Sequence, residues 1–179
     1  KLARLGTADP VEAFIDPAPL IASFDFGRFS RAPARFDEAE LAQVNARIIH
    51  QLPFAAVAHR LPPGMGEAAW EAIRPNLERV AQAADWWAIV TGPLTPPAVE
   101  ADDAAFLAEA AQVAATLDWA QDPWHALVDA LKASSGRKGK ALFLPLRRAL
   151  TGLDHGPDMG ALLPLIGHDA AVARLQAAA

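Results

Sequence analysis

Apolar residues recur three and four positions apart in several stretches of this chain, with polar residues between them. The first stretch has its apolar positions at Leu41, Val44, Ile48 and Leu52. This spacing places them on one face of a helix. Asp37 predicts the start of that helix, because its carboxylate can accept hydrogen bonds from free amide groups while Glu40 reaches back as in a capping box. Pro53 predicts the end of the helix.

A second stretch with helical spacing contains a proline. Its apolar positions are Trp70, Ile73, Leu77 and Val80. Pro75 lacks an amide hydrogen, so we expect a kinked helix in which the carbonyl of Glu71 has no partner. The kink would change the direction of the Arg74 side chain relative to that of Arg79. The tandem Trp86–Trp87 follows on a short helix and is interpreted as a wedge in the core, with a base-stacking platform as the alternative.

Helix signals continue in the C-terminal half of the chain. Acidic caps and prolines at first helical positions are typical of helix starts. The predicted starts are Asp102 or Asp103, Asp122–Pro123, about Lys140, Pro157 and His168–Asp169. The helix from Lys140 is expected to run to Thr151 and to end at Gly152, which can adopt the left-handed conformation of a C-cap. No stretch gives a clear strand signal, so the pattern predicts an all-α protein.

Prolines divide the chain into three parts. Residues 1–35 contain Pro10, Pro17, Pro19 and Pro33 and have room for one short helix, near 19–24, so they are interpreted as a connector. The segment 91–97 is rich in proline and is not expected to be helical. We therefore expect one helical subdomain over 36–92 and a second over 93–179.

Composition supports an ordered helical protein and excludes several kinds of site. Of the 179 residues, 53% are hydrophobic and 21% are charged, and tyrosine is absent. Without cysteine the chain has no disulfide, no thiolate zinc site and no cysteine nucleophile. No apolar run approaches the roughly 18 residues of a membrane span and no charged-then-apolar leader opens the chain, so we expect a cytoplasmic protein. Because the sequence begins at Lys1 rather than Met, we also expect a fragment.

Charge is segregated along a chain whose formal net charge is −5. The 52 residues from Val80 to Leu131 hold eight carboxylates and no Lys or Arg, whereas Lys132 to Arg148 hold six cations and no carboxylate. A Gly-x-x-Gly hinge, Gly136 to Gly139, lies inside this basic stretch. Such a block is expected of a surface that meets phosphate. A solvated basic loop is the more common alternative.

Motifs for catalysis are absent from the sequence. No glycine-rich phosphate loop follows a strand, no Gly-x-Ser-x-Gly occurs, and no histidine pair has the spacing of metal ligands on a helix. The pair Asp102–Asp103 is explained by the preference of a helix N-terminus for negative charge. We therefore expect that this chain by itself is not an enzyme.

One long ordered stretch resembles a known family. It comprises Gly139–Gly152, His155–Met159 and Leu162–Gly167. It is similar to the C-terminal anticodon-binding region of bacterial glutamyl-tRNA synthetases. Arg35–Asp37 with Leu41 and Asn45 resembles the family's helix after the catalytic core, and Lys1–Thr7 resembles the segment that leads into it. The family's ATP-binding signatures have no counterpart here, so the chain is either the C-terminal part of a synthetase or a freestanding relative.

The resemblance implies a helical stem-contact portion followed by an anticodon-binding helical bundle that docks the anticodon stem-loop of glutamate tRNA. It also implies that ATP and magnesium belong to a catalytic domain outside this chain, which has no cofactor of its own, and that this domain is a further partner. In the family an arginine of an Arg-Pro pair lies at the anticodon, and here that pair is Arg74–Pro75. The predicted RNA-binding residues are Arg74, Arg79, Arg137, Lys138, Gly139, Lys140, Arg147 and Arg148. Arg147 has the alternative role of pinning its helix to the core.

Two other functions are compatible with the same residues. In a helical protein-interaction domain, the acidic residues 80–131 would dock a partner and the basic stretch would keep the domain soluble. A freestanding RNA-binding regulator is the other alternative. Salt dependence separates RNA binding from protein docking, because log affinity for single-stranded RNA falls with log salt by roughly 0.7 per phosphate contact, whereas apolar docking hardly responds.

Overall fold

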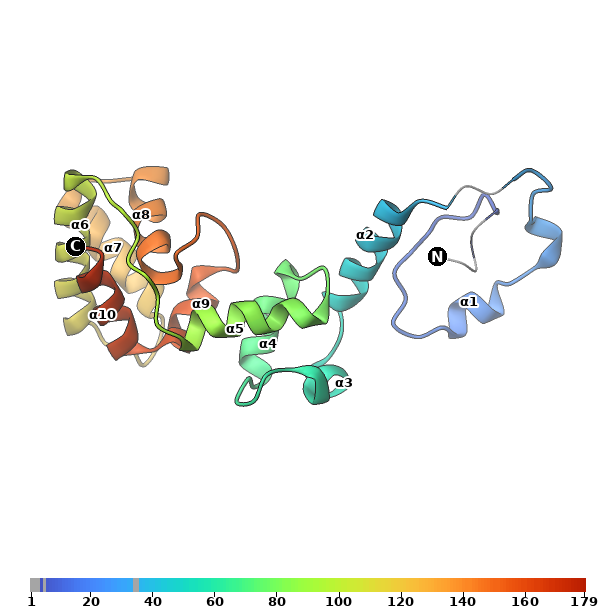
Figure 1. The fold of residues 1–179 in the computed structure, drawn as a ribbon, viewed down its shortest axis with the longest axis horizontal. Helices are drawn as coiled ribbons and strands as arrows, with labels where there is room; N and C mark the ends of the chain where they lie inside the picture. The colour runs from blue at the N-terminus through green and yellow to red at the C-terminus, as the bar shows by residue number, and fades with distance from the viewer. Residues whose placement is uncertain (1–3, 5, 34–35) are drawn as a thin grey trace. The chain divides into compact units, whose positions relative to one another are not determined.

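The computed structural model describes residue 4 and residues 6–33 and 36–179, and all regular secondary structure in these ranges is helical. The all-α prediction is therefore confirmed. The chain forms two compact units, Lys1–Ala83 and Ala84–Ala179 (Figure 1). The predicted resemblance at Arg35, and most of that at Lys1–Thr7, lies outside the described residues.

The first unit contains short helices joined by turns. They are α1 (Ala18–Ala22), α2 (Glu38–Ile49), α3 (Phe54–Val57) and α4 (Glu67–Ile73). The predicted cap of α2 is confirmed, because the Asp37 carboxylate accepts from the amide groups of Ala39 (2.8 Å) and Glu40 (3.2 Å). The buried face of α2 differs from the predicted one. Val44 and Ile49 are buried, whereas Leu41 is exposed.

The expectation of one kinked helix through Pro75 is wrong. Helix α4 ends at Ile73, a 3₁₀ turn covers Arg74–Asn76, and a separate 3₁₀ turn covers Val80–Gln82. A proline at this point removes an amide donor and crowds the preceding turn, so the helix stops instead of bending. Side chains of α2 and of its C-cap residue then hold the chain between the two turns. Asn45 Nδ2 donates to Glu78 O (2.6 Å), and His50 Nε2 donates to Leu77 O (2.9 Å).

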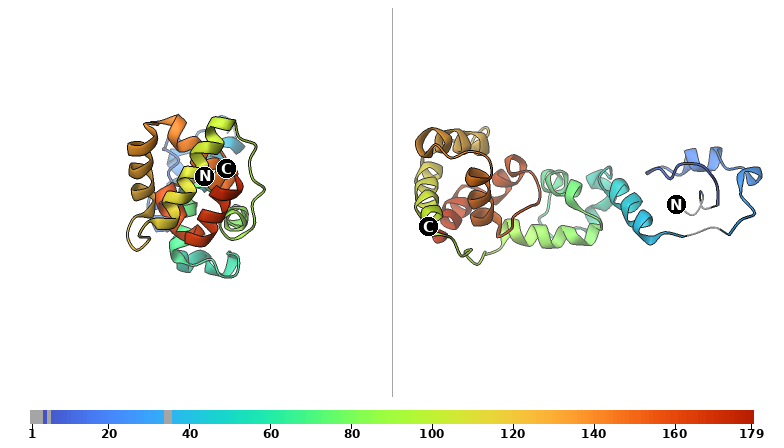
Figure 2. Two further views of the ribbon diagram at one scale, coloured as in Figure 1. Left: turned by 90° about the vertical axis from the view of Figure 1, so that its left-hand side faces the viewer. Right: turned by 90° about the horizontal axis from the view of Figure 1, so that it is seen from above.

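The second unit is a bundle of packed helices (Figure 2). It contains most of α5 (Ala83–Thr91), together with α6 (Ala101–Thr116), α7 (Pro123–Ser135), α8 (Lys140–Thr151), α9 (Met159–Ile166) and α10 (His168–Ala177). Helix α10 packs on α6 and α8, and α7 packs on α6 and α9. Small alanines at the α6 positions Ala110, Ala111 and Ala114 are buried and let neighbouring backbones come close.

Several predicted helix boundaries in the second unit are confirmed. Asp122 accepts from the His125 amide (3.1 Å) with Pro123 at the first helical position, and α8 runs from Lys140 to Thr151. Gly152 ends α8 in the left-handed conformation, with φ 74°. Two starts differ slightly. Helix α6 begins at Ala101, so Asp102 and Asp103 lie in its first turn, and α9 begins after the cap Asp158 rather than at Pro157.

The units divide inside α5, between Ala83 and Ala84, whereas the proline-rich segment had suggested a boundary at 92/93. The reason lies in the end of α5. Arg174 of α10 donates to two α5 carbonyls, Ile89 O (2.8 Å) and Val90 O (3.0 Å), and to Gly92 O (2.9 Å) just after the helix. The same guanidinium donates to Leu150 O at the end of α8 (2.8 Å). These bonds hold α5 and the start of the proline-rich segment in the second unit.

Candidate nucleic-acid interface

The connection between α7 and α8 carries the two lysines of the predicted phosphate-binding motif. Lys138 and Lys140 are exposed and flank Gly139. Neither ammonium group has a hydrogen bond or a close ion pair among the described residues, although the charge of Lys140 contributes to lowering the pKa of Asp154. Gly136 (φ 67°) and Gly139 (φ 54°) both lie in a region of backbone conformation that favours glycine. The two glycines form a tight turn that leaves both ammonium groups in solvent.

The start of α8 lies at the same turn. Gly139 is its N-cap and supplies no side-chain cap. The Gly139 carbonyl accepts from Leu142 (3.1 Å) and Phe143 (3.0 Å), so regular helical bonding begins only there. The first amide groups of a helix carry partial positive charge and attract anions. Lys138 and Lys140 add full charges of the same sign beside them.

An exposed aromatic ring completes this surface. Phe143, one turn after Lys140, is 39% exposed and lies beside the buried Trp124, with ring centroids 6.2 Å apart. An aromatic ring next to lysines can stack on an unpaired base. We call Lys138, Lys140 and Phe143 the α8 basic surface. The prediction of RNA-binding residues did not include Phe143, although its position three residues after Lys140 on a helix was a usable signal.

Arg137, which the sequence grouped with these lysines, has other partners. Its Nη1 lies 2.5 Å from Asp103 Oδ1 and its Nη2 donates to Asp102 O (2.8 Å), while its Cζ lies 4.4 Å above the ring of Phe106. Nη1 also donates to Ala141 O (3.2 Å). Pro145 leaves that carbonyl without the usual helical donor four residues later. Arg137 thus anchors α6 and compensates a proline inside α8.

The two arginines near the end of α8 also have partners within the second unit. Arg147 Nη1 donates to Pro157 O (3.1 Å), and burial lowers the pKa of Arg147 while the charge of Asp158 opposes that change. Arg148 donates two hydrogen bonds to the Asp154 carboxylate, from Nε to Oδ1 (2.5 Å) and from Nη2 to Oδ2 (2.8 Å). This pair lowers the pKa of Asp154.

Arg74 and Arg79 belong to the first unit. Arg74 Nη1 donates to Leu52 O (2.9 Å), a carbonyl that also accepts from Trp70 Nε1 (2.9 Å), and not to the carbonyl of Glu71. Arg74 Nη2 lies 3.9 Å from the Glu71 carboxylate. Arg79 is exposed, and its guanidinium makes no hydrogen bond or ion pair with the described residues. It borders an open groove of about 440 Å³ that Leu41 also lines.

The described residues contain neither a metal-binding cluster nor a membrane-spanning helix. No group of three or more His, Asp or Glu residues in this part of the chain could hold a metal ion. No helix in the same part is long and apolar enough to cross a membrane.

Comparison with known proteins identifies the family. A family model described as "Anticodon binding domain" matches residues 32–179. The chain belongs to the anticodon-binding domain family. The α8 basic surface and all the predicted RNA-binding residues lie inside the part of the chain that matches this model.

The relatives of this anticodon-binding domain are longer proteins, each of which the chain matches over part of its length. Glutamate–tRNA ligase 1 of Novosphingobium aromaticivorans is 66% identical over 176 residues, which are 98% of this chain and 40% of that protein. Glutamate–tRNA ligase 2 of Sphingopyxis alaskensis is 62% identical over 177 residues, 99% of this chain and 40% of that protein. The chain therefore spans about 40% of the length of the curated relatives it matches.

Solved structures share the fold of this anticodon-binding domain. A glutamate tRNA ligase from Elizabethkingia meningosepticum, crystallised in complex with its amino acid, aligns with a TM-score of 0.76 at 18% identity. The alignment covers 97% of this chain and 38% of that one. At this identity the likeness shows the fold alone.

Proposed function

We propose that this chain is the anticodon-binding part of a glutamate–tRNA ligase and that it binds the anticodon stem-loop of glutamate tRNA. The observation that carries the proposal is the α8 basic surface inside a chain of the anticodon-binding family. Identity of 66% to a glutamate–tRNA ligase supports the choice of glutamate tRNA. Activation of glutamate, with its ATP and magnesium, then belongs to the part of the ligase that this chain does not match.

The α8 basic surface offers three kinds of contact that suit an RNA loop. Lys138 and Lys140 can neutralise phosphates, and the start of α8 can receive a phosphate oxygen on its amide groups. Phe143 can stack on a base that the loop leaves unpaired. In the alternative of a protein-interaction domain, the acidic residues 80–131 would bind the partner, and the two exposed lysines at the start of α8 would have no role in binding.

A salt titration tests the proposal. The ligand is an RNA hairpin with the sequence of the glutamate tRNA anticodon stem-loop, and affinity is measured at several salt concentrations. Replacing both Lys138 and Lys140 by alanine should weaken binding and reduce the slope of log affinity against log salt by about 0.7 for each lost contact. The α8 basic surface also predicts that Phe143→Leu weakens binding at constant slope.

Lys132→Ala is the matched control. Lys132 lies in the same basic stretch, but its Nζ pairs with Asp129 Oδ1 (3.3 Å). Its replacement should leave RNA affinity nearly unchanged. Equal affinity of the parent and the double lysine variant would reject the α8 basic surface as an RNA site, and binding of the hairpin without salt dependence would reject phosphate recognition altogether.

A further inference from the structure

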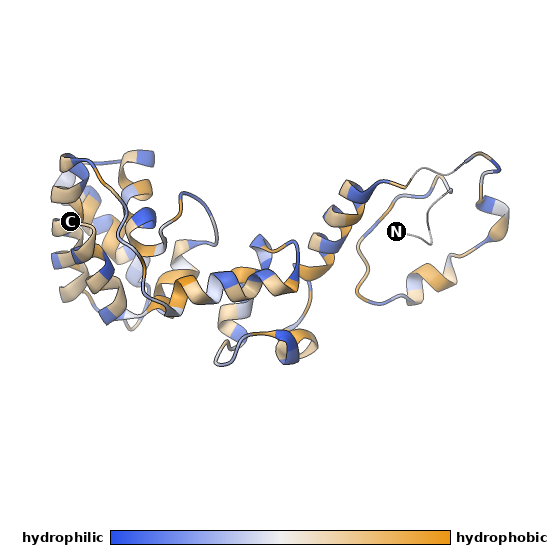
Figure 3. Cartoon of the chain, viewed as in Figure 1, coloured by the Kyte–Doolittle hydropathy of each residue, from blue (hydrophilic) through white to orange (hydrophobic). Residues whose placement is uncertain are grey.

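The turn between α7 and α8 makes few backbone hydrogen bonds of its own. It is hydrophilic (Figure 3) and runs from Gly136 (φ 67°) to Gly139 (φ 54°). Glycine adopts many backbone conformations at little cost, so these two residues do not by themselves determine the path of the chain between them. The backbone of residues 137 and 138 makes a single hydrogen bond among the described residues, from the Arg137 amide to Ser135 Oγ (3.2 Å). Other contacts are needed to order the turn.

The side chain of Arg137 supplies these contacts. Its Nη1 lies 2.5 Å from Asp103 Oδ1, and its Nη2 donates to Asp102 O (2.8 Å). Both partners lie in the first turn of α6. The side chains of Arg137 and Asp103 are 21% and 32% exposed, so water screens this pair less than the pair of Lys132 and Asp129, which are 44% and 73% exposed. The guanidinium therefore links the turn to α6.

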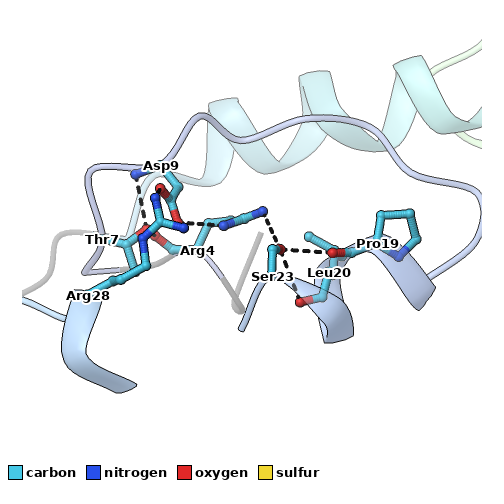
Figure 4. Close-up of polar contacts among 7 residues, drawn as sticks. All are labelled: Arg4, Thr7, Asp9, Pro19, Leu20, Ser23 and Arg28. Carbon is cyan, nitrogen blue, oxygen red and sulfur yellow. Dashed lines mark hydrogen bonds and ion pairs between the residues drawn. The ribbon is translucent and has the colours of Figure 1, made fainter. Parts of the chain in front are cut away.

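A similar pairing occurs in the first unit (Figure 4). Asp9 pairs with Arg4 (2.5 Å) and with Arg28, and Arg4 also donates to Ser23 Oγ (2.8 Å). These bonds join the non-helical stretch at Asp9 to the short helical turns that end near residues 23 and 28. In both units an aspartate thus binds an arginine and holds a stretch of chain that has no helix of its own.

The two lysines of the α8 basic surface depend on the Arg137 link to different degrees. Lys140 is the first residue of α8, so the helix itself sets the position of its backbone. Lys138 lies outside both helices and directly follows Arg137. The Cα atoms of neighbouring residues are about 3.8 Å apart, so contacts that hold Arg137 also hold the backbone of Lys138.

We propose that Asp103 and Arg137 are positioning residues for RNA binding. Their pair holds Lys138 where its ammonium group can contact a phosphate, and neither side chain contacts the RNA itself. The inference rests on the proposed function, because it concerns the α8 basic surface. It gives a carboxylate a favourable part in binding a polyanion, although the charge of a carboxylate alone would oppose binding. The sign of the effect of removing Asp103 is therefore informative.

Affinity of the full chain for the anticodon hairpin tests the proposal. Asp103→Ala removes the ion pair but leaves Arg137 its carbonyl partners, Asp102 O and Ala141 O. Loss of a whole lysine–phosphate contact should weaken binding roughly fourfold at about 0.15 M salt, from the slope of 0.7 per contact. Asp103→Ala should weaken binding about threefold, because Lys138 becomes less ordered but keeps its charge.

Asp102→Ala is the matched control. It removes the same charge from the same turn of α6, but Arg137 bonds only to the backbone carbonyl of this residue. The carboxylate of Asp102 is exposed and makes no hydrogen bond or close ion pair among the described residues. Hairpin affinity should therefore stay level or rise slightly in this variant.

A double-mutant cycle separates positioning from a general loss of stability. In a Lys138→Ala background, Asp103→Ala should have no further effect on hairpin affinity, whereas in a Lys140→Ala background it should keep its effect of about threefold. A general loss of stability would act equally in both backgrounds. NMR without RNA adds an independent measurement. The order parameter of the Lys138 amide should fall from about 0.85 to below about 0.6 in Asp103→Ala and should stay unchanged in Asp102→Ala.

Three results would overturn the proposal. Higher affinity of Asp103→Ala, with a steeper dependence on salt, would show that the released Arg137 contacts phosphate directly. Equal losses of affinity in the two lysine backgrounds would assign Asp103 to the stability of its unit. Unchanged affinity and an unchanged order parameter would show that the turn keeps its conformation without the pair. Hairpin affinity that does not depend on Lys138 in the parent chain would be a different result, because it would reject the proposed function together with this inference.

Discussion

At the scale of single residues, arginines in this chain bond to backbone carbonyls. Arg74, Arg137, Arg147 and Arg174 each donate to at least one, and Arg174 donates to four. A guanidinium suits this role because it has five donors in a fixed plane. The six cations of the basic stretch therefore do not all face solvent. Lys138 and Lys140 do, whereas Arg137 is held on α6.

Arg137 donates to Ala141 O, the carbonyl that Pro145 leaves without its usual helical donor. Two substitutions can isolate the contribution of this hydrogen bond. Arg137→Ala should lower the free energy of unfolding by about 1 to 2 kcal/mol, because it also removes the pair with Asp103. In a Pro145→Ala background the helix can supply its own donor to Ala141 O, so the cost should be about 0.5 kcal/mol smaller. Urea unfolding of the four proteins measures this coupling. Strictly additive costs would contradict compensation, and Lys138→Ala serves as the control with little expected effect.

The pair of Arg148 and Asp154 predicts a dependence on pH. The hydrogen bonds from Arg148 lower the pKa of Asp154. A carboxyl whose pKa is lowered by folding stabilises the fold above its ordinary pKa, and this contribution is lost as the pH falls through the folded value. Arg148→Ala should return the pKa of Asp154 toward its ordinary range, and variant and parent should converge in stability at acidic pH. An NMR titration of the Asp154 carboxyl that is identical in both proteins would disprove the coupling.

Arg74 has a structural contact and a proposed role in reading the anticodon. Arg74→Ala should lower the free energy of unfolding by about 1 kcal/mol, because Leu52 O keeps Trp70 as a second donor. As a base reader, Arg74 should also supply about 1 to 3 kcal/mol of discrimination between the cognate hairpin and one altered at the contacted base. Affinities for both hairpins separate the two effects. A cognate-to-altered affinity ratio that the mutation leaves unchanged would rule out base reading.

At the scale of elements, Gly152 at the end of α8 and Gly156 in the loop after it differ in what opposes a side chain at their positions. Gly152 ends α8 with φ 74°, and an added Cβ there would contact nothing within 4 Å. At Gly156, with φ 142°, an added Cβ would come within 2.3 Å of Trp86 Cη2. The Trp86 ring therefore lies against this loop, but Trp86 and Trp87 are only half-buried and do not form the predicted wedge in the core. Only the second glycine is required by a neighbour.

Alanine substitutions should separate the two constraints. Gly152→Ala should cost about 1 kcal/mol, the strain of a left-handed residue with a side chain. Gly156→Ala should cost about 2 to 4 kcal/mol, because overpacking against Trp86 adds to the backbone strain. Denaturant unfolding of both variants provides the comparison. Equal costs would show that the loop moves away from Trp86 without penalty, and Trp86→Leu should relieve part of the Gly156→Ala cost.

At the scale of the whole molecule, the chain divides into two compact units, and the place of division can be tested with fragments. A fragment of residues 84–179 keeps the α5 carbonyls that Arg174 binds and the buried Val90. A fragment of residues 93–179 loses them. We expect the shorter fragment to be less stable by about 2 to 4 kcal/mol, from the lost burial and the unpaired guanidinium. Equal free energies of unfolding would place the boundary at 92/93, where the proline-rich segment had suggested it.

Local signals in the sequence determined the helical class, most helix boundaries and the resemblance to the anticodon-binding family. The cap at Asp122 and the glycine at 152 act within one helical turn, so their effect can be read from neighbouring residues. The sequence also shows Lys138 and Lys140 on either side of Gly139, within the basic stretch.

Tertiary structure alone decided which cations remain in solvent, how the chain continues after Pro75 and where the units divide. In each case the deciding partner lies far along the chain. Arg74 donates to the carbonyl of Leu52, Arg137 pairs with the carboxylate of Asp103, and Arg174 donates to a carbonyl at the end of α5. An unpaired carbonyl binds whichever donor packing brings to it, and packing joins residues whose separation leaves no periodic signal in the sequence.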